Sequence, residues 1–411
     1  MKQNNEVVTF GCRLNIYESE IIKQNLELSG LNDVVVFNTC TVTKTAEKEA
    51  IRSIKKMKKN RPNVDIIVTG CAAQTNPGLF SSLSEVTKVL GNEEKLIVDN
   101  YILKGEKISV SDIMEVKETS PHMVSSFSEH SRAFLQIQNG CNHRCTFCII
   151  PFGRGNSRSV PLGGVVNQVK ALVRNGYKEV VLTGVDVTSY GGDLPGEPSF
   201  GQMIRRLLAL VPELKRLRLA SIDVAEIDDD LFDLMSYEER LMPHFHISLQ
   251  SGDNMILKRM KRRHNRQDVI EFCNKLRSKR PDVAFGADII AGFPTETDDM
   301  FLNSLNLISE ANLQYLHVFP YSPREGTPAF RMPQVENHIK KERARLLREK
   351  GEQSQDMFFR QAEGKVMNLL IENNFTARSE NFIPVQLKEE KKVGEIISGR
   401  LKYTNMCMEL Y

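Results

Sequence analysis

The chain contains no tryptophan, no run of apolar residues long enough for a membrane span and no large excess of charge. Its 411 residues include 55 lysines and arginines against 52 aspartates and glutamates. This balance excludes a histone-like mode of nucleic-acid binding but leaves local basic patches open. A bilayer span needs about 18 apolar residues, and the first residues lack the apolar region of a signal peptide. We therefore expect a cytoplasmic protein with no membrane partner.

The chain is about 2.7 times the length of a typical domain, which predicts two or three domains. Hydrophobic residues make up 41% and charged residues 26%, the composition of a folded protein. Eight cysteines are present. Where thiols are kept reduced, a disulfide framework is not expected, and closely spaced thiolates bind a metal or a cluster instead.

The first hundred residues alternate short β-branched runs with helix formers. Strands are expected at 7–10, 34–37 and 66–68, and helices at 17–28 and 44–59. This alternation predicts a parallel α/β sheet in a domain of residues 1–115. Asn15 and Glu18, three residues apart, are predicted to cap the first helix.

A cysteine follows each of these three strands: Cys12, Cys40 and Cys71. The carboxyl ends of parallel strands meet at one edge of a sheet, where open α/β folds bind ligands. A single cysteine is more often an inert buried thiol. Three at matching positions predict a cluster that leaves one ligand position open.

Residues 116–132 hold five serines and no periodicity, and are interpreted as a linker. A second α/β unit, 133–350, predicts a partial or full β/α barrel. Its expected strands are 134–137, 180–182, 217–219, 245–249, 284–290 and 316–319. A charged helical run follows from 340 to about 361, and residues 351–411 predict a small β-barrel. Its expected strands are 366–371, 382–387, 394–401 and 406–411.

The most specific motif is the loop after the first strand of the second unit, which contains Cys141, Cys145 and Cys148. Three thiolates at these spacings can bind three irons of a 4Fe–4S cluster and leave the fourth iron open. Structural zinc is the alternative, with His143 as a candidate ligand. No second Cys-x-x-Cys pair lies nearby, so the cluster is favoured.

This CxxxCxxC loop at the end of a first barrel strand resembles the signature of radical S-adenosylmethionine enzymes. Three later stretches extend the resemblance, although each alone is compatible with a turn or a capped strand. The resemblance implies cofactor-binding roles for Gly184 and Asp186 after the second strand, for Ser248 and Gln250 in 246–252, and for Ile290 and Gly292 in 289–296. It implies no acid or base, and the catalytic residues stay unassigned.

With two cysteine sets and three parts, the chain resembles the radical S-adenosylmethionine methylthiotransferases, whose last part is a TRAM barrel. Its tail is short for that barrel. Four segments resemble the branch that acts on threonylcarbamoyladenosine in tRNA: GCRLNIYES (11–19), NTCTVT (38–43), TGCAAQ (69–74) and CIIPFGRGNSRS (148–159). The resemblance implies two 4Fe–4S clusters, S-adenosylmethionine, a tRNA substrate and an electron donor such as flavodoxin or ferredoxin.

Two alternatives remain open. One is the branch that acts on isopentenyladenosine in tRNA, and the other is a non-catalytic iron–sulfur protein for RNA binding or electron transfer. Two basic segments suit phosphate contacts: 51–61 and 258–266 each hold six lysines and arginines. A solvated helix face is an equally good interpretation of both. Cys273 and Cys407 are expected to be packing residues.

Overall fold

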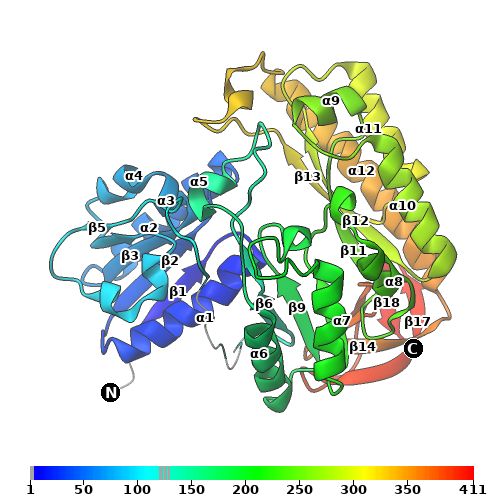
Figure 1. Ribbon diagram of the computed structural model, residues 1–411, viewed down its shortest axis with the longest axis horizontal. Helices are drawn as coiled ribbons and strands as arrows, with labels where there is room; N and C mark the ends of the chain where they lie inside the picture. Colours follow the sequence, from blue (N-terminus) through cyan, green and yellow to red (C-terminus); the bar gives the residue numbers. More distant parts are fainter. Residues whose placement is uncertain (1–3, 120–123, 125–126, 128–129) are drawn as a thin grey trace.

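The computed structural model describes residues 4–119, 124, 127 and 130–411. It consists of an N-terminal α/β sheet, a central α/β barrel and a C-terminal β-barrel (Figure 1). No helix in these residues combines the length and the apolarity that a membrane crossing requires. The predicted fold class is confirmed in all three parts.

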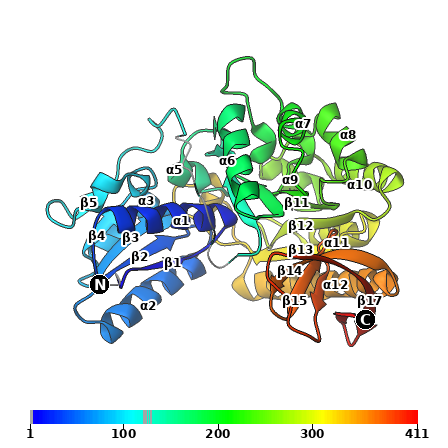
Figure 2. The same cartoon turned by 90° about the horizontal axis from the view of Figure 1, so that it is seen from below.

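The N-terminal sheet has five parallel strands in sequence order: β1 (Glu6–Thr9), β2 (Val34–Thr39), β3 (Asp65–Gly70), β4 (Lys88–Leu90) and β5 (Ile108–Ser109). Helices α1 (Arg13–Leu28) and α2 (Lys44–Asn60) cover opposite faces of it (Figure 2). Val34 and Val36 pack with α1, whereas Val35 and Phe37 pack with α2. Because β2 is buried on both faces, its first four residues form a continuous apolar run instead of an alternating pattern.

The predicted start of the first helix is wrong. Helix α1 begins at Arg13 with Cys12 at its N-cap, so Asn15 lies within the first turn. The Asn15 amide donates instead to the carbonyls of Phe10 and Thr39, at 2.6 and 3.2 Å. Glu18 is completely buried and forms ion pairs. The Asn–Glu spacing therefore reflects contacts with other elements and not a capping box.

The central barrel has six parallel strands: β6 (Ala133–Gln136), β9 (Glu179–Thr183), β10 (Arg216–Leu219), β11 (His244–Gln250), β12 (Ala284–Ala291) and β13 (Tyr315–Pro320). They form two three-stranded sheets, joined by the isolated parallel bridges Leu217–Leu241 and Ile222–Ile247. No pairing joins β6 to β13 in the described part of the chain. The barrel is thus partial and open on one side.

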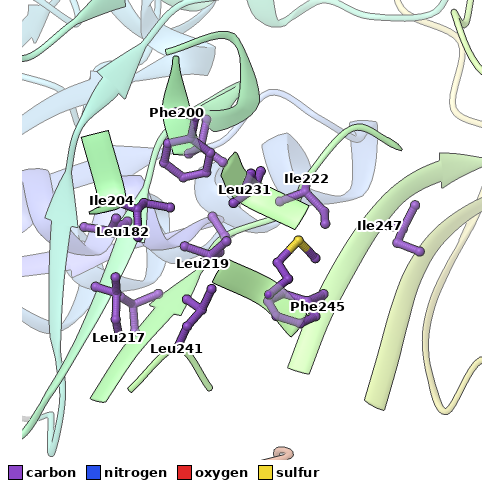
Figure 3. Packing of buried hydrophobic residues seen from close by; sticks show 14 of the residues in the cluster. Leu182, Phe200, Ile204, Leu217, Leu219, Ile222, Leu231, Leu241, Phe245 and Ile247 are labelled. Carbon is purple, nitrogen blue, oxygen red and sulfur yellow. The ribbon is translucent and has the colours of Figure 1, made fainter. Parts of the chain in front are cut away.

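Five helices of the barrel follow the expected βα order: α6 (Leu162–Arg174), α7 (Phe200–Leu210), α8 (Asp229–Tyr237), α10 (Arg266–Lys279) and α11 (Asp298–Glu310). Leu182, Leu217 and Phe245 from the strands pack with Phe200 and Ile204 of α7 in the core (Figure 3). Helix α1 joins this core through Tyr17 and Ile21. Helix α1 therefore packs in the core of the N-terminal sheet and also in the core of the barrel, and it holds these two parts together.

The C-terminal part is a closed five-stranded barrel in the order β14–β15–β16–β18–β17. Its strands are β14 (Val366–Asn373), β15 (Thr376–Ser379), β16 (Pro384–Gln386), β17 (Ile396–Thr404) and β18 (Cys407–Leu410). Strand β15 is short and has one apolar residue, and the sequence pattern did not predict it. Helix α12 (Asn337–Ala362) runs unbroken across the expected boundary at 350, and it contacts both the central barrel and β17.

Most of the expected linker (120–123, 125–126 and 128–129) lies outside the described residues. Val124 and Phe127 are buried in the barrel core. The Gln168 side chain donates to the Val124 carbonyl at 2.5 Å, and the Phe127 ring meets that of Phe134 edge to face. These two apolar residues of the segment pack against the barrel.

Leu207 and Leu210 of α7 provide a matched test of the barrel core. Leu207 is fully buried, whereas Leu210 is 50% exposed. Leu207→Ala should lower the free energy of unfolding by about 2–5 kcal/mol, because it removes buried apolar surface and leaves a cavity. Leu210→Ala on the same helix should change it by less than about 0.5 kcal/mol. Urea unfolding followed by circular dichroism measures both, and equal losses would contradict this packing.

Candidate functional site

The CxxxCxxC loop connects β7 (Gln138–Asn139) to the short helix α5 (Ile150–Arg154), and β8 (Arg158–Ser159) returns to pair with β7. Gly140 opens the loop with φ +73°, and a Cβ there would lie 1.9 Å from the Asn156 carbonyl oxygen. The Cys141 amide donates to the Gly155 carbonyl at 3.1 Å. The loop is therefore folded back on α5, and only glycine fits at its first position.

The three thiols of this loop lie close enough to interact electrostatically, Cys148 with both Cys141 and Cys145. Burial raises the pKa of Cys148 to about 12. The Arg262 guanidinium lies 3.7 Å from the Cys145 sulfur and donates to Asp223 at 2.9 Å. Three gathered thiols beside a partly buried cation fit a cluster bound through thiolates.

Asp186, predicted to bind the cofactor, lies directly beside this loop. One carboxylate oxygen is 3.5 Å from the Cys141 sulfur and 2.9 Å from His143 Nε2. His143 Nε2 also lies 3.2 Å from Glu226, and the hydrogen bonds to Asp186 and Glu226 raise the His143 pKa to about 9. The Cys141, His143 and Asp186 ligand atoms lie within 4.8 Å of one another. The imidazole is thus held by carboxylates instead of facing all three thiols.

Gly184 directly follows β9, at the start of the turn that carries Asp186. A Cβ there would be 2.7 Å from the Gln138 carbonyl oxygen and 2.8 Å from Gln138 Oε1. That side-chain oxygen accepts from the amides of Val185 and Asp186, at 3.0 and 2.9 Å. Gly184 therefore lets Gln138 fix the turn that carries Asp186 toward Cys141.

Ser248 and Gln250 occupy the last part of β11. The Ser248 carbonyl accepts from Arg262 at 2.7 Å, so this strand contacts the guanidinium beside Cys145. Gln250 adopts φ +73°, which is rare for a residue other than glycine. On the same strand, His246 Nε2 lies 3.0 Å from Asp288, and His317 Nδ1 lies 3.3 Å from that carboxylate. Sequence analysis did not single out this His–Asp–His group.

Ile290 and Gly292 lie at the end of β12 and have different surroundings. Ile290 packs in an apolar cluster with Phe293 and with Phe147, which stands inside the CxxxCxxC loop. This places an apolar surface next to the thiols. A Cβ on Gly292 would lie 2.5 Å from Lys340 Cγ, so its lack of a side chain accommodates α12.

Cys12, Cys40 and Cys71 gather at the carboxyl edge of the N-terminal sheet. The register pairs Thr9 with Asn38 and Thr39 with Gly70, which brings the three strand ends level. Cys40 interacts electrostatically with both other thiols, and burial raises its pKa to about 11. The predicted convergence is present, and three gathered thiols suit iron–sulfur ligation.

A buried arginine from the barrel part, Arg154 of α5, reaches this N-terminal set. Its Nε lies 3.2 Å from the Cys71 sulfur, and its Nη2 donates to Asn15 at 2.5 Å and to Glu18 at 2.9 Å. The sequence pattern did not predict this role for Arg154. Its position six residues after Cys148 was the only signal, because Cys71, Asn15 and Glu18 lie more than 80 positions away.

The two basic segments differ in the structure. Segment 258–266 lies close to the candidate site and is largely engaged: Arg262 and Arg263 pair with Asp223, and Arg266 pairs with Glu310. Segment 51–61 lies on α2 and keeps exposed lysines at positions 55, 56 and 59. Of the two segments, α2 therefore offers the open basic face.

The two remaining cysteines behave differently. Cys273 is fully buried in the barrel core, as predicted. Cys407 is exposed, and its expected packing role is wrong. In β18, Cys407 alternates with the buried Met408, so it points out of the small barrel.

Two family models match the chain. The Radical SAM superfamily matches residues 135–308, and the Uncharacterized protein family UPF0004 matches residues 4–91. These ranges contain the CxxxCxxC loop and the three N-terminal cysteines.

Curated relatives match over most of their length. The chain is 65% identical to the threonylcarbamoyladenosine tRNA methylthiotransferase MtaB of Rickettsia prowazekii, over 96% of this chain and 94% of that protein. It is 31% identical to the tRNA-2-methylthio-N(6)-dimethylallyladenosine synthase of Ehrlichia canis, over 89% and 87%.

Among solved structures, the radical S-adenosylmethionine methyltransferase TsrM from Kitasatospora setae is similar, with a TM-score of 0.59 and 13% identity. The match covers 80% of this chain and 77% of that one. At this identity the likeness concerns the fold alone.

Gly11 tests the N-terminal set. It has φ +94°, and a Cβ there would lie 2.8 Å from Cys40 Cβ and 3.0 Å from the Cys40 sulfur. Gly11→Ala should therefore displace Cys40 and lower iron bound to the reconstituted protein by about half. Gly105→Ala is the matched control, because Gly105 has φ +113° and nothing within 4 Å of the added Cβ. Equal iron content in both variants would show that the N-terminal cysteines bind iron without a glycine at position 11.

Proposed function

The chain belongs to the threonylcarbamoyladenosine tRNA methylthiotransferase family, and from this premise we propose how its residues divide the work. It is a radical S-adenosylmethionine enzyme that acts on tRNA and forms the 2-methylthio derivative of threonylcarbamoyladenosine. The observation that carries the proposal is the pair of three-thiol sets, one at the carboxyl edge of each α/β part. Arg154 links the two sets, because it lies on the helix that follows the CxxxCxxC loop and contacts the sulfur of Cys71.

Cys141, Cys145 and Cys148 hold the 4Fe–4S cluster to which S-adenosylmethionine binds. When bound, this cluster would supply one electron for the reductive cleavage of S-adenosylmethionine, chemistry that ends in methionine and 5′-deoxyadenosine once a hydrogen atom has been taken from an unactivated C–H bond. The chain orients the cofactor. Gly184 permits the turn that carries Asp186, Ser248 and Gln250 line the end of β11, and Ile290 offers apolar contact beside Phe147.

Cys12, Cys40 and Cys71 hold a second 4Fe–4S cluster, through which sulfur reaches the substrate. Three thiols leave one cluster position open in each set. We infer that the substrate nucleotide, which lies next to the anticodon, enters on the side where no strand pairing joins β6 to β13 in the described residues. An electron donor such as flavodoxin or ferredoxin completes the system, and a cytoplasmic location follows from the tRNA substrate. The domain limits 1–115, 116–132, 133–350 and 351–411 stay part of this proposal.

The isopentenyladenosine branch is the second candidate, because that relative is also 31% identical over most of the chain. The 65% identity to the threonylcarbamoyladenosine enzyme favours the first. Mass spectrometry of tRNA nucleosides from cells lacking the protein separates them. Loss of methylthio-threonylcarbamoyladenosine supports the first candidate, whereas loss of methylthio-isopentenyladenosine contradicts it.

The two cysteine sets should separate in a paired mutant test. Cys12→Ala, Cys40→Ala and Cys71→Ala together should leave cleavage of S-adenosylmethionine and abolish the methylthio nucleoside, because sulfur has no route to the substrate. The matched triple variant at 141, 145 and 148 should lose both. Chromatography of 5′-deoxyadenosine and nucleoside analysis of the same preparation measure this. A normal methylthio product from the first variant would refute the two-cluster assignment.

The basic face of α2 should contribute to tRNA binding. Changing Lys55, Lys56 and Lys59 to glutamine should weaken binding. It should also lower the slope of log K against log salt by up to about 0.7–0.9 for each tRNA phosphate that a lysine no longer neutralises. Cofactor cleavage without tRNA should not change. Three exposed barrel lysines, Lys215, Lys275 and Lys279, serve as the control. An equal effect of both triple changes would mean that α2 is only a solvated face.

A further inference from the structure

Arg154 follows the CxxxCxxC loop in the sequence, but it contacts the other cysteine set, through Cys71. Helix α5 continues directly from the CxxxCxxC loop, yet it lies against α3 (Cys71–Thr75) of the N-terminal part (Figure 1). The approach is close, because a Cβ on Gly153 would lie 3.3 Å from Cys71 Cβ. The Asn92 amide strengthens it by donating both to the Gly153 carbonyl at 2.5 Å and toward the Cys71 sulfur at 3.7 Å.

The guanidinium of Arg154 is 2% exposed, and its nitrogens contact four partners, of which Asn139 is the most distant at 3.5 Å. Nε faces the Cys71 sulfur at 3.2 Å, and the two terminal nitrogens bind Glu18 and Asn15. A planar fork suits this arrangement, since it directs several N–H groups at fixed angles. A lysine ammonium would supply the charge without the fork.

The buried charges around Cys71 do not cancel. Glu18 is paired with both Arg154 and Lys95, the latter at 2.6 Å, and all three side chains are buried. One carboxylate against two cations leaves one surplus positive charge beside the three thiols. A buried surplus charge is costly unless an anion compensates it.

A cluster bound by three thiolates has the compensating sign. Its oxidised core carries two positive charges, so three thiolates leave it with one negative charge, and reduction adds another. The site therefore fits an anionic iron–sulfur cluster better than neutral thiols. The charge match is a property of the chain's own buried residues. The inference drawn from it rests on the second cluster of the proposed function.

We propose that Arg154 is a positioning residue for the N-terminal cluster, holding the Cys71 thiolate and setting the reduction potential of that cluster. Electrons arrive at an already negative group, so a nearby cation favours reduction and a nearby anion opposes it. Arg154 and Glu18 thus act in opposite directions on the same cluster. Because Arg154 is carried by the loop of the other set, it also fixes the N-terminal cluster relative to the radical site.

The test uses full-length protein with Cys141, Cys145 and Cys148 changed to alanine, so that the N-terminal cluster is the only one present. The midpoint potential is measured by a redox titration followed by electron paramagnetic resonance. Arg154→Gln should shift the potential to more negative values, and Glu18→Gln should shift it to more positive values. Arg154→Lys should fall between Arg154→Gln and the parent, with an altered spectrum because the fork is absent.

Arg205→Gln is the control, because it removes an arginine from an exposed ion pair with Asp230 on the barrel surface. It should leave the potential unchanged. If the Arg154→Gln protein fails to fold, the test is decided by the midpoint potential of the near-isosteric variant Glu18→Gln. Unchanged potentials in both with iron present would overturn this inference only. A parent protein that binds no iron would overturn the second cluster and this inference together.

Discussion

The burial of Glu18 is the constraint on which the arrangement of the two cysteine sets depends. Burial by itself would raise the pKa of this carboxyl, but Arg154 and Lys95 lower it, so Glu18 stays ionised. A buried carboxylate without partners is strongly destabilising. Its two cations come from different parts of the chain, and Arg154 comes from the barrel. Separating the parts would leave both Glu18 and Arg154 without full compensation, which keeps Cys71 next to α5.

A second buried ion-pair group plays the same role at the other end of the barrel. Glu179 at the start of β9 is completely buried and lies 2.8 Å from Arg218 and 3.2 Å from Arg132. Both arginines also reach the C-terminal barrel: Arg218 donates to the Ser379 carbonyl at 2.8 Å, and Arg132 pairs with Glu372. The central barrel is thus joined to its neighbours on both sides through carboxylates buried at the interfaces.

The sequence predicted what depends on local pattern. Three of the five N-terminal strands and all six barrel strands were expected from short β-branched and aromatic runs, whereas the short strands β4 and β5 were not predicted. The convergence of Cys12, Cys40 and Cys71 followed from their positions after parallel strands. The role of Glu18 was misjudged because its partner Arg154 is 136 positions away. Capping is a local hypothesis, and nothing local could exclude it. Strand β15 was missed because its pairing, not its composition, makes it a strand.

Contacts between residues distant in the sequence also explain why the basic side chains of one segment are paired and those of the other are exposed. In segment 258–266 the arginines lie beside buried carboxylates, and Asp223 accepts from both Arg262 and Arg263. Arg262 is thereby held 3.7 Å from the Cys145 sulfur, as Arg154 is held at Cys71 by Glu18. Each cysteine set therefore has one guanidinium that a carboxylate orients toward a cysteine sulfur. A count of basic residues would treat both segments alike, whereas the contacts place Arg262 beside the CxxxCxxC loop and leave three lysines of α2 exposed.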